Sequence, residues 1–383
     1  MSAEKKRIGI LTFHNSYNCG SMMQAYALQQ YLKKLGVESE IIDFSNEGQK
    51  RLYSVFFKDY SIKNLIKNCI LFFHQRKIKK NYQYYELFKR ANFILSKNSY
   101  EKEEELIDED YDYIICGSDQ IWNITIADSD DAYFLPWVKN AKKIAYAPSF
   151  GAKNIVKYAQ NVEDYKAFLQ DFDSLSIRED NGQIWLKDLI GKNIPVVLDP
   201  TLLLAREDYE KIINTNIKTP EKYIFYYSPG YSKGINRLVK KISKKYKLPV
   251  IAFNAKSFYL KGMNFTTSFQ LPSFENPAVY LRLIKKATMV ITTSFHGTVF
   301  STIFEKTFWT IKNGGMFGDD DRVLSMMKKL DLEDRLVSMD FDDDFNYLQS
   351  KDYQKYHSNL TREQDFSIHY LSSALRLENE KGK

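Results

Sequence analysis

Cysteine, histidine and long apolar runs are scarce in this sequence of 383 residues, and each scarcity excludes a class of protein. The cysteines, Cys19, Cys69 and Cys116, are odd in number and widely separated, which argues against a disulfide framework. None of them has a histidine or a second cysteine at metal-ligand spacing, so the sequence predicts no metal site. No apolar run approaches the ~20 residues of a membrane-spanning helix. We therefore expect a protein of the reducing cytoplasm.

The start of the chain has positive charge before a short apolar run, as a secretory signal has. The run breaks at His14 and Asn15 without a small-residue cleavage site, so residues 8–13 are predicted to form a buried strand instead. With 44% apolar and 27% charged residues, the composition is that of a soluble globular protein. A single hydrophobic core usually stops growing at roughly 250 to 300 residues, so the length predicts two domains.

Strand patterns alternate with helix patterns along the chain. Residues 8–43 contain a strand, the loop HNSYNCGS, a helix that ends at Gly36 and a second strand. Further strands are predicted in YIICG, KIAYAPSF, LSIRED and PVVLDPTL and, after a charged connector, in YIFYYSPG, LPVIAFNA and TMVITTSF. Because this alternation favours parallel sheets, we predict an α/β fold with two Rossmann-like domains, residues 1–205 and 206–350, and a C-terminal helical tail, residues 351–383.

The net charge of +7 is concentrated in one segment. Residues 58–90 hold nine Lys or Arg against Asp59 and Glu86. Between 62 and 80 this charge is mixed with apolar residues on one helical face, namely Leu65, Ile66, Ile70, Leu71, Phe72 and Phe73. Such a segment is typical of peripheral contact with an anionic membrane, of binding to a phosphorylated ligand, or of a surface helix that packs its apolar side on the core. No nucleic-acid-binding motif accompanies the charge, so no nucleic acid is expected as a partner.

The loops that follow the strands hold the candidate site residues, because ligands of open parallel sheets bind beyond the carboxyl ends of the strands. After the first strand, Asn18, Gly20 and Ser21 are suited to turn backbone amides toward an anion at a helix start, although tight turns use the same residues. The neighbouring Cys19 has no evident base partner, which favours an inert thiol.

A second candidate loop, GSDQIWN, follows the buried strand around Ile114. Asp119, Gln120 and Asn123 are suited to hold sugar hydroxyls, with Trp122 as an apolar platform. Alternatively, the carboxylate and amide side chains cap the following turn, and the indole fills the core.

The stretch ITTSFHGTVFSTIF is predicted to be a β-branched strand that ends at Thr293 and Ser294 and continues as a helix, with His296 at the break. An anion there would meet hydroxyls, backbone amides and a ring that titrates near neutrality. His296 therefore suits phosphate binding or proton transfer, although a lone histidine also serves structural roles. His14 shares the first loop and is a secondary candidate. The remaining histidines are predicted on exposed helices: His74, His357 and His369.

A dianionic ligand would need cations at the same loops. Arg178, in LSIRED, ends a short buried strand and is placed for a bidentate contact with a carboxylate or phosphate. Lys312, after the strand FWTI, and Arg322, at a helix start, either add positive charge to the ligand site or form salt bridges and helix caps.

Six stretches together resemble polysaccharide pyruvyl transferases. They are NSYNCGSMMQAYALQQYLKKLG, YIICGSDQIWN, LSIRED, VVLDPTLLL, VITTSFHGTVFSTIFEKTF and DRVLSMMKKLDLEDRL, in the order seen in that family, between about residues 7 and 340. The resemblance implies two Rossmann-type domains that face each other across a cleft, the GT-B arrangement of glycosyltransferases. It also implies transfer of the enolpyruvyl group of phosphoenolpyruvate to two hydroxyls of a hexose in a cell-surface polysaccharide or its lipid-linked precursor, giving a pyruvate ketal and phosphate.

On the donor side, the resemblance places the family's arginine on Arg178, for anion binding, and its histidine on His296, for phosphate contact or acid catalysis. Two residues before that histidine the family has an arginine, and this chain has Ser294. Lys312, Arg322 or another cation is therefore expected to complete the donor site.

On the acceptor side, Asp119 is the candidate sugar contact or general base, and further contacts are expected from Asn18, Gln120 and Asn123. The chemistry implies neither a metal nor another cofactor beside the donor substrate. A lipid-linked acceptor at the inner face of the cytoplasmic membrane would give residues 62–80 a peripheral membrane contact.

Two other functions stay open at this point. Nucleotide-sugar-dependent GT-B glycosyltransferases use the same two-domain cleft, and Ser294 in place of the family's arginine keeps this function open. A non-catalytic sugar- or anion-binding relative would bind its ligand without releasing phosphate.

Overall fold

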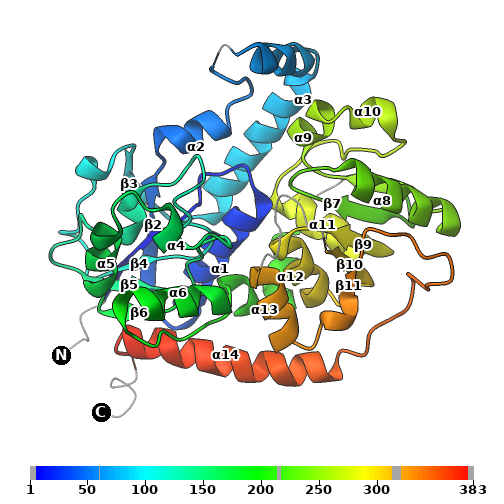
Figure 1. Ribbon diagram of the computed structural model, residues 1–383. Helices are drawn as coiled ribbons and strands as arrows, with labels where there is room; N and C mark the ends of the chain where they lie inside the picture. Colours follow the sequence, from blue (N-terminus) through cyan, green and yellow to red (C-terminus); the bar gives the residue numbers. More distant parts are fainter. Residues whose placement is uncertain (1–5, 60, 214–216, 313–320, 378–383) are drawn as a thin grey trace.

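The computed structural model describes residues 6–377 apart from 60, 214–216 and 313–320. Two parallel sheets lie side by side with helices packed around each (Figure 1). The strand order is β3-β2-β1-β4-β5-β6 in the first sheet and β11-β10-β9-β7-β8 in the second. The predicted α/β fold with two Rossmann-like sheets is confirmed.

The first sheet consists of β1 (Arg7–Leu11), β2 (Glu38–Phe44), β3 (Leu95–Tyr100), β4 (Tyr113–Cys116), β5 (Lys142–Ala145) and β6 (Ser174–Leu175). The helices of this part are α1 (Cys19–Lys34), α2 (Glu47–Leu52), α3 (Ile62–Asn92), α4 (Ile155–Tyr158), α5 (Val162–Gln170) and α6 (Asp180–Ile190). All residues of the central strand β4 are buried, as expected for a parallel strand covered on both faces.

The second sheet consists of β7 (Ile224–Tyr227), β8 (Val250–Ala252), β9 (Met289–Thr292), β10 (Phe308–Ile311) and β11 (Leu336–Val337). The helices of this part are α7 (Arg206–Glu210), α8 (Lys233–Tyr246), α9 (Ala255–Leu260), α10 (Met263–Thr266), α11 (Pro277–Lys286), α12 (Phe295–Ile303), α13 (Asp321–Lys329) and α14 (Gln354–Ala374).

The strand order reverses between β1 and β4 in the first sheet and between β7 and β9 in the second. A crevice forms at such a point, because the connections that follow the two central strands leave in opposite directions. The reversals place the candidate loops around Asn18 and Asp119 next to each other, and they place His296 directly after a central strand of the other sheet.

The strand predicted in PVVLDPTL is wrong. Val196 forms only an isolated bridge with Ile177, and a 3₁₀ helix, Pro200–Leu202, follows at once. Proline cannot donate to a strand ladder, and the Asp199 side chain caps the turn by accepting from the Thr201 amide at 3.0 Å. The 3₁₀ helix that follows this cap contacts α1 of the first half and α12 of the second.

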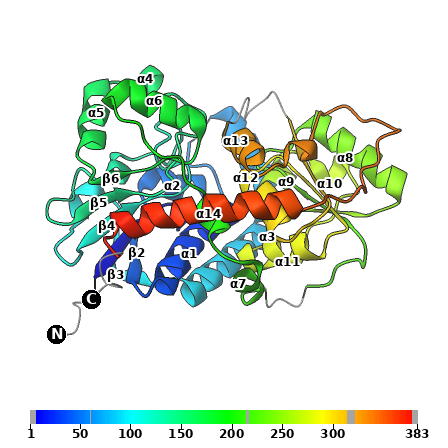
Figure 2. The same cartoon turned by 90° about the horizontal axis from the view of Figure 1, so that it is seen from below.

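Two long helices connect the halves of the molecule. α3 connects β2 to β3 of the first sheet but packs on the second half, where Asn81 donates to Glu275 at 2.8 Å and His74 stacks on Tyr259. α14 runs along both halves (Figure 2). It contacts the first half through Tyr370, whose hydroxyl donates to the Ala145 carbonyl at 2.9 Å. The predicted C-terminal helix is therefore present, while the exact domain boundaries stay a prediction.

We expect Leu371→Ala to lower the free energy of unfolding by about 2–5 kcal/mol, because this fully buried side chain of α14 would leave a cavity in the core. Phe366→Ala, at a half-exposed position of the same helix, should change it by less than about 0.5 kcal/mol. Urea unfolding measures both changes. Equal unfolding midpoints would show that α14 does not pack as described.

Candidate functional site

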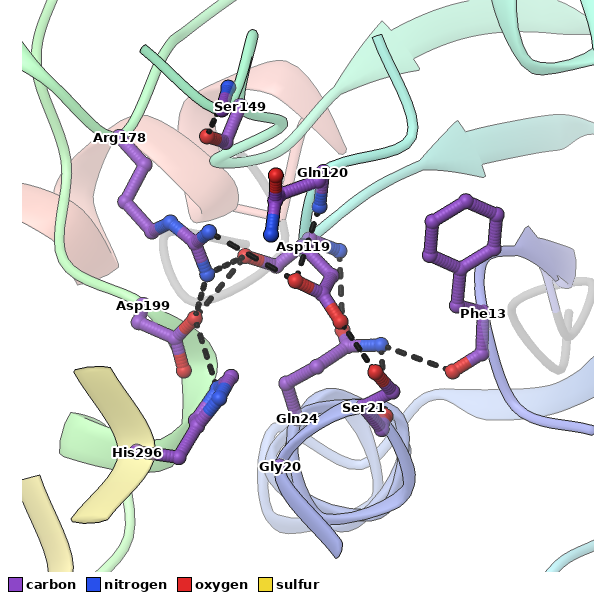
Figure 3. A network of polar contacts seen from close by, with 12 residues as sticks. Phe13, Gly20, Ser21, Gln24, Asp119, Gln120, Ser149, Arg178, Asp199 and His296 are labelled. Atoms are coloured by element: carbon purple, nitrogen blue, oxygen red, sulfur yellow. Dashed lines mark hydrogen bonds and ion pairs between the residues drawn. The ribbon is translucent and has the colours of Figure 1, made fainter. Parts of the chain in front are cut away.

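The centre of the candidate site is the carboxylate of Asp199, which is fully buried between the two halves (Figure 3). Its Oδ2 accepts from Arg178 Nη1 at 2.6 Å and lies 3.1 Å from Ser118 Oγ. Its Oδ1 accepts from the Thr201 hydroxyl at 2.6 Å. On the other side, Nε2 of His296 lies 3.6 Å from Oδ2. Asp199 thus brings together Arg178 from the first half and His296 from the second.

The charge of Asp199 is fixed by these neighbours. Burial alone would raise the pKa of its carboxyl group, but His296, followed by Arg178 and the Thr201 hydroxyl, holds the pKa well below its usual range. Asp199 is therefore ionised at neutral pH, and the imidazole lies beside a permanent negative charge.

Arg178 is buried but only partly satisfied. One edge of its guanidinium group binds Asp199, and the Phe295 ring lies 4.6 Å from its Cζ atom. Among the residues that the structure describes, its Nε and Nη2 have no hydrogen-bond partner, and Nη2 is 3.7 Å from Asp119. Nε2 of His296 also has no hydrogen-bond partner in this part of the chain. Because buried donors are rarely left unpaired, these groups mark a place where an anion can bind.

Asp119 lies on the opposite side of Arg178. Its φ of 69° falls in the left-handed region, where a residue with a side chain is strained, and such strain is concentrated at functional sites. Its Oδ1 accepts from the Gln120 amide at 2.9 Å, and its Oδ2 accepts from the hydroxyl of Ser21 at the start of α1. The loop after β4 and the first turn of α1 are therefore held together at the anion site.

The first turn of α1 contacts His296 directly. Asn18 caps this helix by accepting from the Gly20 amide at 2.9 Å. A Cβ atom on Gly20 would lie 2.2 Å from Nδ1 of His296, so only glycine permits this contact. Gln24, one turn further on, donates to Thr12 Oγ1 at 2.8 Å and accepts from the Ser118 amide at 3.0 Å. Gln24 thereby connects the loops that follow β1 and β4.

The other residues predicted on the acceptor side shape the loop after β4. Gln120 accepts from Asn123 at 3.1 Å, and the pair lies against Gly151, where a Cβ atom would be 2.2 Å from Oε1 of Gln120. Trp122 is fully buried and donates to the Tyr133 carbonyl at 3.1 Å, so it fills the core.

The remaining donor-side candidates differ in position. Ser294 caps α12 by accepting from the Gly297 amide at 3.3 Å. Arg322 is buried at the start of α13, and it lies near enough to Glu179 to affect its ionisation. Burial raises the pKa of Glu179 to about 7, although Arg178 and then Arg322 oppose this. Lys312 is exposed after β10 and does not join the network around Asp199 within the described part of the chain.

Two residues of the first loop have structural partners. His14 is fully buried, and its Nε2 lies 2.9 Å from Asp43 Oδ1. Cys19 is the first residue of α1, and its thiol lies 3.1 Å from the Tyr85 hydroxyl. Burial raises the pKa of this thiol well above its ordinary value, which disfavours a nucleophilic thiolate.

A cavity of about 370 Å³ lies beside the α1 cap. Its walls come from the loops before α1 and after α2, from α3, and from the ends of β7 and β8 with α9. The aromatic members of its lining are Tyr17, Tyr53, Phe57, Tyr82, Tyr85, Tyr227 and Phe253. Its polar members include Asn18, Glu275 and Lys256. Burial raises the pKa of Glu275 to about 7 and lowers that of Lys256 to about 8.

Reasoning from the sequence missed Asp199, Ser118, Gln24 and the aromatic cavity. The Asp-Pro-Thr sequence at 199–201 is a signal for a cap at a helix start, and it would have been a better guide than the apolar run before it. No group of metal ligands occurs among the described residues. No helix of the described chain has both the length and the apolarity to cross a bilayer.

Two Rossmann-type parallel sheets with a polar network between them define a GT-B-like protein. S. aureus MnaA in complex with UDP is similar over 98% of both chains, with a TM-score of 0.51 and 11% identity. A UDP-GlcNAc 2-epimerase from Neisseria meningitidis, bound to UDP-GlcNAc, covers 96% of this chain and 100% of its own, with a TM-score of 0.49 and 9% identity. E. coli heptosyltransferase WaaC matches 80% of this chain and 88% of its own, with a TM-score of 0.37 and 11% identity. The expected GT-B-like fold is confirmed.

The chain belongs to the polysaccharide pyruvyl transferase family, whose model matches residues 18–315. No curated protein matches the chain.

Gly20→Ala should displace His296, because the added methyl group would overlap the imidazole ring. We expect the free energy of unfolding to fall by about 1–3 kcal/mol, as for other overpacked sites. Gly234→Ala is the matched control, since a Cβ atom in this first turn of α8 would meet only Met339 Sδ at 3.6 Å. Thermal unfolding and the imidazole NMR signals of both variants test the contact. Unchanged stability and an unshifted His296 signal in Gly20→Ala would contradict it.

Proposed function

We propose that the protein transfers the enolpyruvyl group of phosphoenolpyruvate to two hydroxyls of one hexose in a cell-surface polysaccharide or its lipid-linked precursor. The observation that carries this proposal is the buried Arg178, whose Nε and Nη2 have no partner within the described chain, beside His296 at the N-terminus of α12. A planar guanidinium group suits the carboxylate or phosphate of the donor. The helix N-terminus adds partial positive charge for the second anionic group.

In the proposed reaction, phosphoenolpyruvate and two sugar hydroxyls give a pyruvate ketal and phosphate. A proton adds to C3 of phosphoenolpyruvate, and a sugar oxygen forms a bond to the resulting electrophilic C2. A second hydroxyl of the same sugar then bonds to C2 while the bond from C2 to the phosphate oxygen breaks. Of the two hydroxyl protons, one balances the proton taken up by C3 and the other leaves with phosphate.

The residues of the site are suited to these steps. His296 is assigned as the acid that protonates C3, and Arg178 as the anion contact. Asp119 is assigned as the base for a sugar hydroxyl, since it lies on the far side of Arg178 and next to the first turn of α1. Asp199 is assigned as the residue that orients Arg178 and His296. The scheme requires no metal or other cofactor.

The acceptor hexose is assigned to the aromatic cavity beside Asn18. Tyr17 and Tyr82 line this cavity and stack on each other with ring centroids 4.2 Å apart. Aromatic rings in a cavity wall suit the apolar side of a sugar ring. The amides and hydroxyls of the lining provide hydrogen-bond partners for the polar side. Asn18 belongs both to this lining and to the cap of the helix that contacts His296, so the acceptor would lie next to the donor.

Phosphate release from phosphoenolpyruvate, measured with a panel of synthetic and lipid-linked hexosides, tests the reaction. We expect release together with a mass gain of one pyruvate less one water on the acceptor. His296→Ala should slow release by about 10²- to 10⁴-fold, the usual range for loss of a general acid. His357→Ala, an exposed histidine of α14, serves as the control.

Release that is insensitive to His296→Ala and Arg178→Ala would refute the assigned site. No release with any acceptor, combined with thermal stabilisation by a nucleotide sugar, would favour a glycosyltransferase instead. The UDP-bound GT-B-like neighbour supports including this arm in the experiment. Binding of phosphoenolpyruvate without turnover would favour a non-catalytic relative.

Tyr82→Ala should raise the KM for the hexose by about tenfold through loss of a stacking face, and leave the KM for phosphoenolpyruvate unchanged. Tyr158→Ala removes an exposed tyrosine of α4, away from the cavity lining, and should change neither constant. Initial rates with each substrate varied in turn distinguish these outcomes. An altered donor KM with an unaltered acceptor KM would exclude the cavity as the acceptor site.

A further inference from the structure

The first half of α3 carries a stripe of exposed apolar side chains. Ile62 is 78% exposed, Ile66 59%, Phe72 62% and Phe73 81%. Leu65 and Cys69 on the same stripe are also exposed. The rings of Phe72 and Phe73 contact each other at a centroid distance of 5.8 Å. The hypothesis that this helix packs its apolar side on the core is wrong for these residues, although Leu71 is buried.

The stripe lies opposite the packed face of the helix. Its members, at positions 62, 65, 66, 69, 72 and 73, have the spacing of one helical face. The packed face includes four buried residues that recur every seven positions, namely Asn64, Leu71, Ile78 and Tyr85. Each of them lies two positions after a residue of the series 62, 69, 76 and 83, which begins with two members of the stripe. Two positions turn an α-helix by about 200°, so the two faces point in opposite directions. Amphipathicity of the usual kind, with one apolar and one polar face, does not account for this pattern.

Positive charge surrounds the stripe. Lys63, Arg76, Lys79 and Lys80 are exposed, and none of them forms an ion pair with a residue that the structure describes. Lys67 lies 4.5 Å from the Phe57 ring, at the border between the stripe and the cavity. A surface that combines exposed apolar side chains with unpaired cations is complementary to an anionic lipid bilayer, in which acyl chains lie beneath negative headgroups.

We propose that this face of α3, Ile62 to Lys80, docks the protein on an anionic membrane surface with the helix lying in the plane of the headgroups. The first turns of α3 lie at the edge of the molecule, away from both sheets, so a flat surface can reach them (Figure 1). With Lys and Arg along its length, the helix is suited to lie on a bilayer and not to cross it.

Docking would also position the aromatic cavity. The opposite face of the same helix contributes Ile78, Asn81, Tyr82 and Tyr85 to the cavity lining. A helix that binds the bilayer on one face therefore holds the cavity about one helix diameter, roughly 10 Å, from the headgroups. This part of the inference rests on the proposed function, since it makes the acceptor a sugar carried on a membrane lipid.

Vesicle co-sedimentation of the full chain tests the docking surface without any turnover. We expect binding to vesicles of phosphatidylcholine mixed with phosphatidylglycerol, little binding to phosphatidylcholine alone, and weaker binding as salt is added. The double variant Phe72→Ser/Phe73→Ser should bind about tenfold more weakly, because it removes the most exposed apolar area. Lys63→Gln/Arg76→Gln should weaken binding to a similar degree, and only on anionic vesicles.

Phe366→Ser, at a half-exposed phenylalanine on α14, is the matched control and should bind as the unaltered protein does. Equal binding by the Phe72/Phe73 variant, or no binding to anionic vesicles at all, would overturn the proposal. So would a dimer in size-exclusion chromatography that this variant converts to a monomer, because the face would then be an interface between two copies.

Transfer to a soluble hexoside separates this proposal from the proposed function. The Phe72→Ser/Phe73→Ser variant should retain that activity and lose activity on an acceptor embedded in anionic vesicles. If the unaltered protein binds vesicles but releases no phosphate with any acceptor, the reaction is wrong and the docking surface stands.

Discussion

A single buried negative charge, on Asp199, organises the site from which the function is inferred. A carboxylate without solvent must be compensated, because removing water from an ion is more costly than a typical protein can tolerate. Here compensation comes from Arg178 and Thr201 in the first half and from His296 in the second. The requirement to satisfy one charge therefore fixes the relative positions of groups that come from two different sheets.

This arrangement depends on contacts that keep the halves in place. Gly20 allows the helix after the first strand to touch the imidazole ring, and Gln24 fixes the two loops at the reversal point of the first sheet. α3 and α14 each leave one half and pack on the other, which limits how far the sheets can move apart. α14 also reaches the site itself, because the Ser367 hydroxyl accepts from the Leu198 amide next to Asp199. Packing of Leu371, one turn further along this helix, therefore contributes to site geometry.

The alternation of strands and helices was sufficient to predict the fold class, because buried parallel strands and their loops have strong local signals. The same signals pointed to Arg178, His296 and Asp119, which the structure brings together through Asp199. Asp199 itself was missed because the apolar run before it indicated a strand, whereas Pro200 and the side-chain cap produce a turn. What no local pattern contains is the tertiary partner of this carboxylate, the guanidinium group of Arg178, which makes Asp199 part of the site.

The α3 segment shows a second limit of sequence patterns. A helix with apolar residues at helical spacing has the same pattern whether its partner is a protein core or a lipid surface. In α3 both kinds of face occur, and the more apolar one is outside, while the packed face includes the polar Asn64 and Asn81. Only the structure shows which face is covered, because coverage depends on where α9 and α11 lie.

Ser294 stands where the family resemblance implies an arginine, and in the proposed reaction this changes how positive charge can be supplied to the donor. Ser294 caps α12, and an arginine at this position would leave the Gly297 amide without that acceptor. A capped helix start is rigid and presents partial positive charge at a fixed place, whereas an arginine brings a full charge on a flexible side chain. In the proposed reaction the phosphate would then depend on Arg178 and the α12 terminus. Arg322 lies near the buried Glu179 and, together with Arg178, opposes the rise in the pKa of that carboxyl group, so any negative charge there has positive groups beside it. The proposed donor site is thus balanced by groups in fixed positions, which is the form of electrostatic stabilisation that requires the least reorganisation during a reaction.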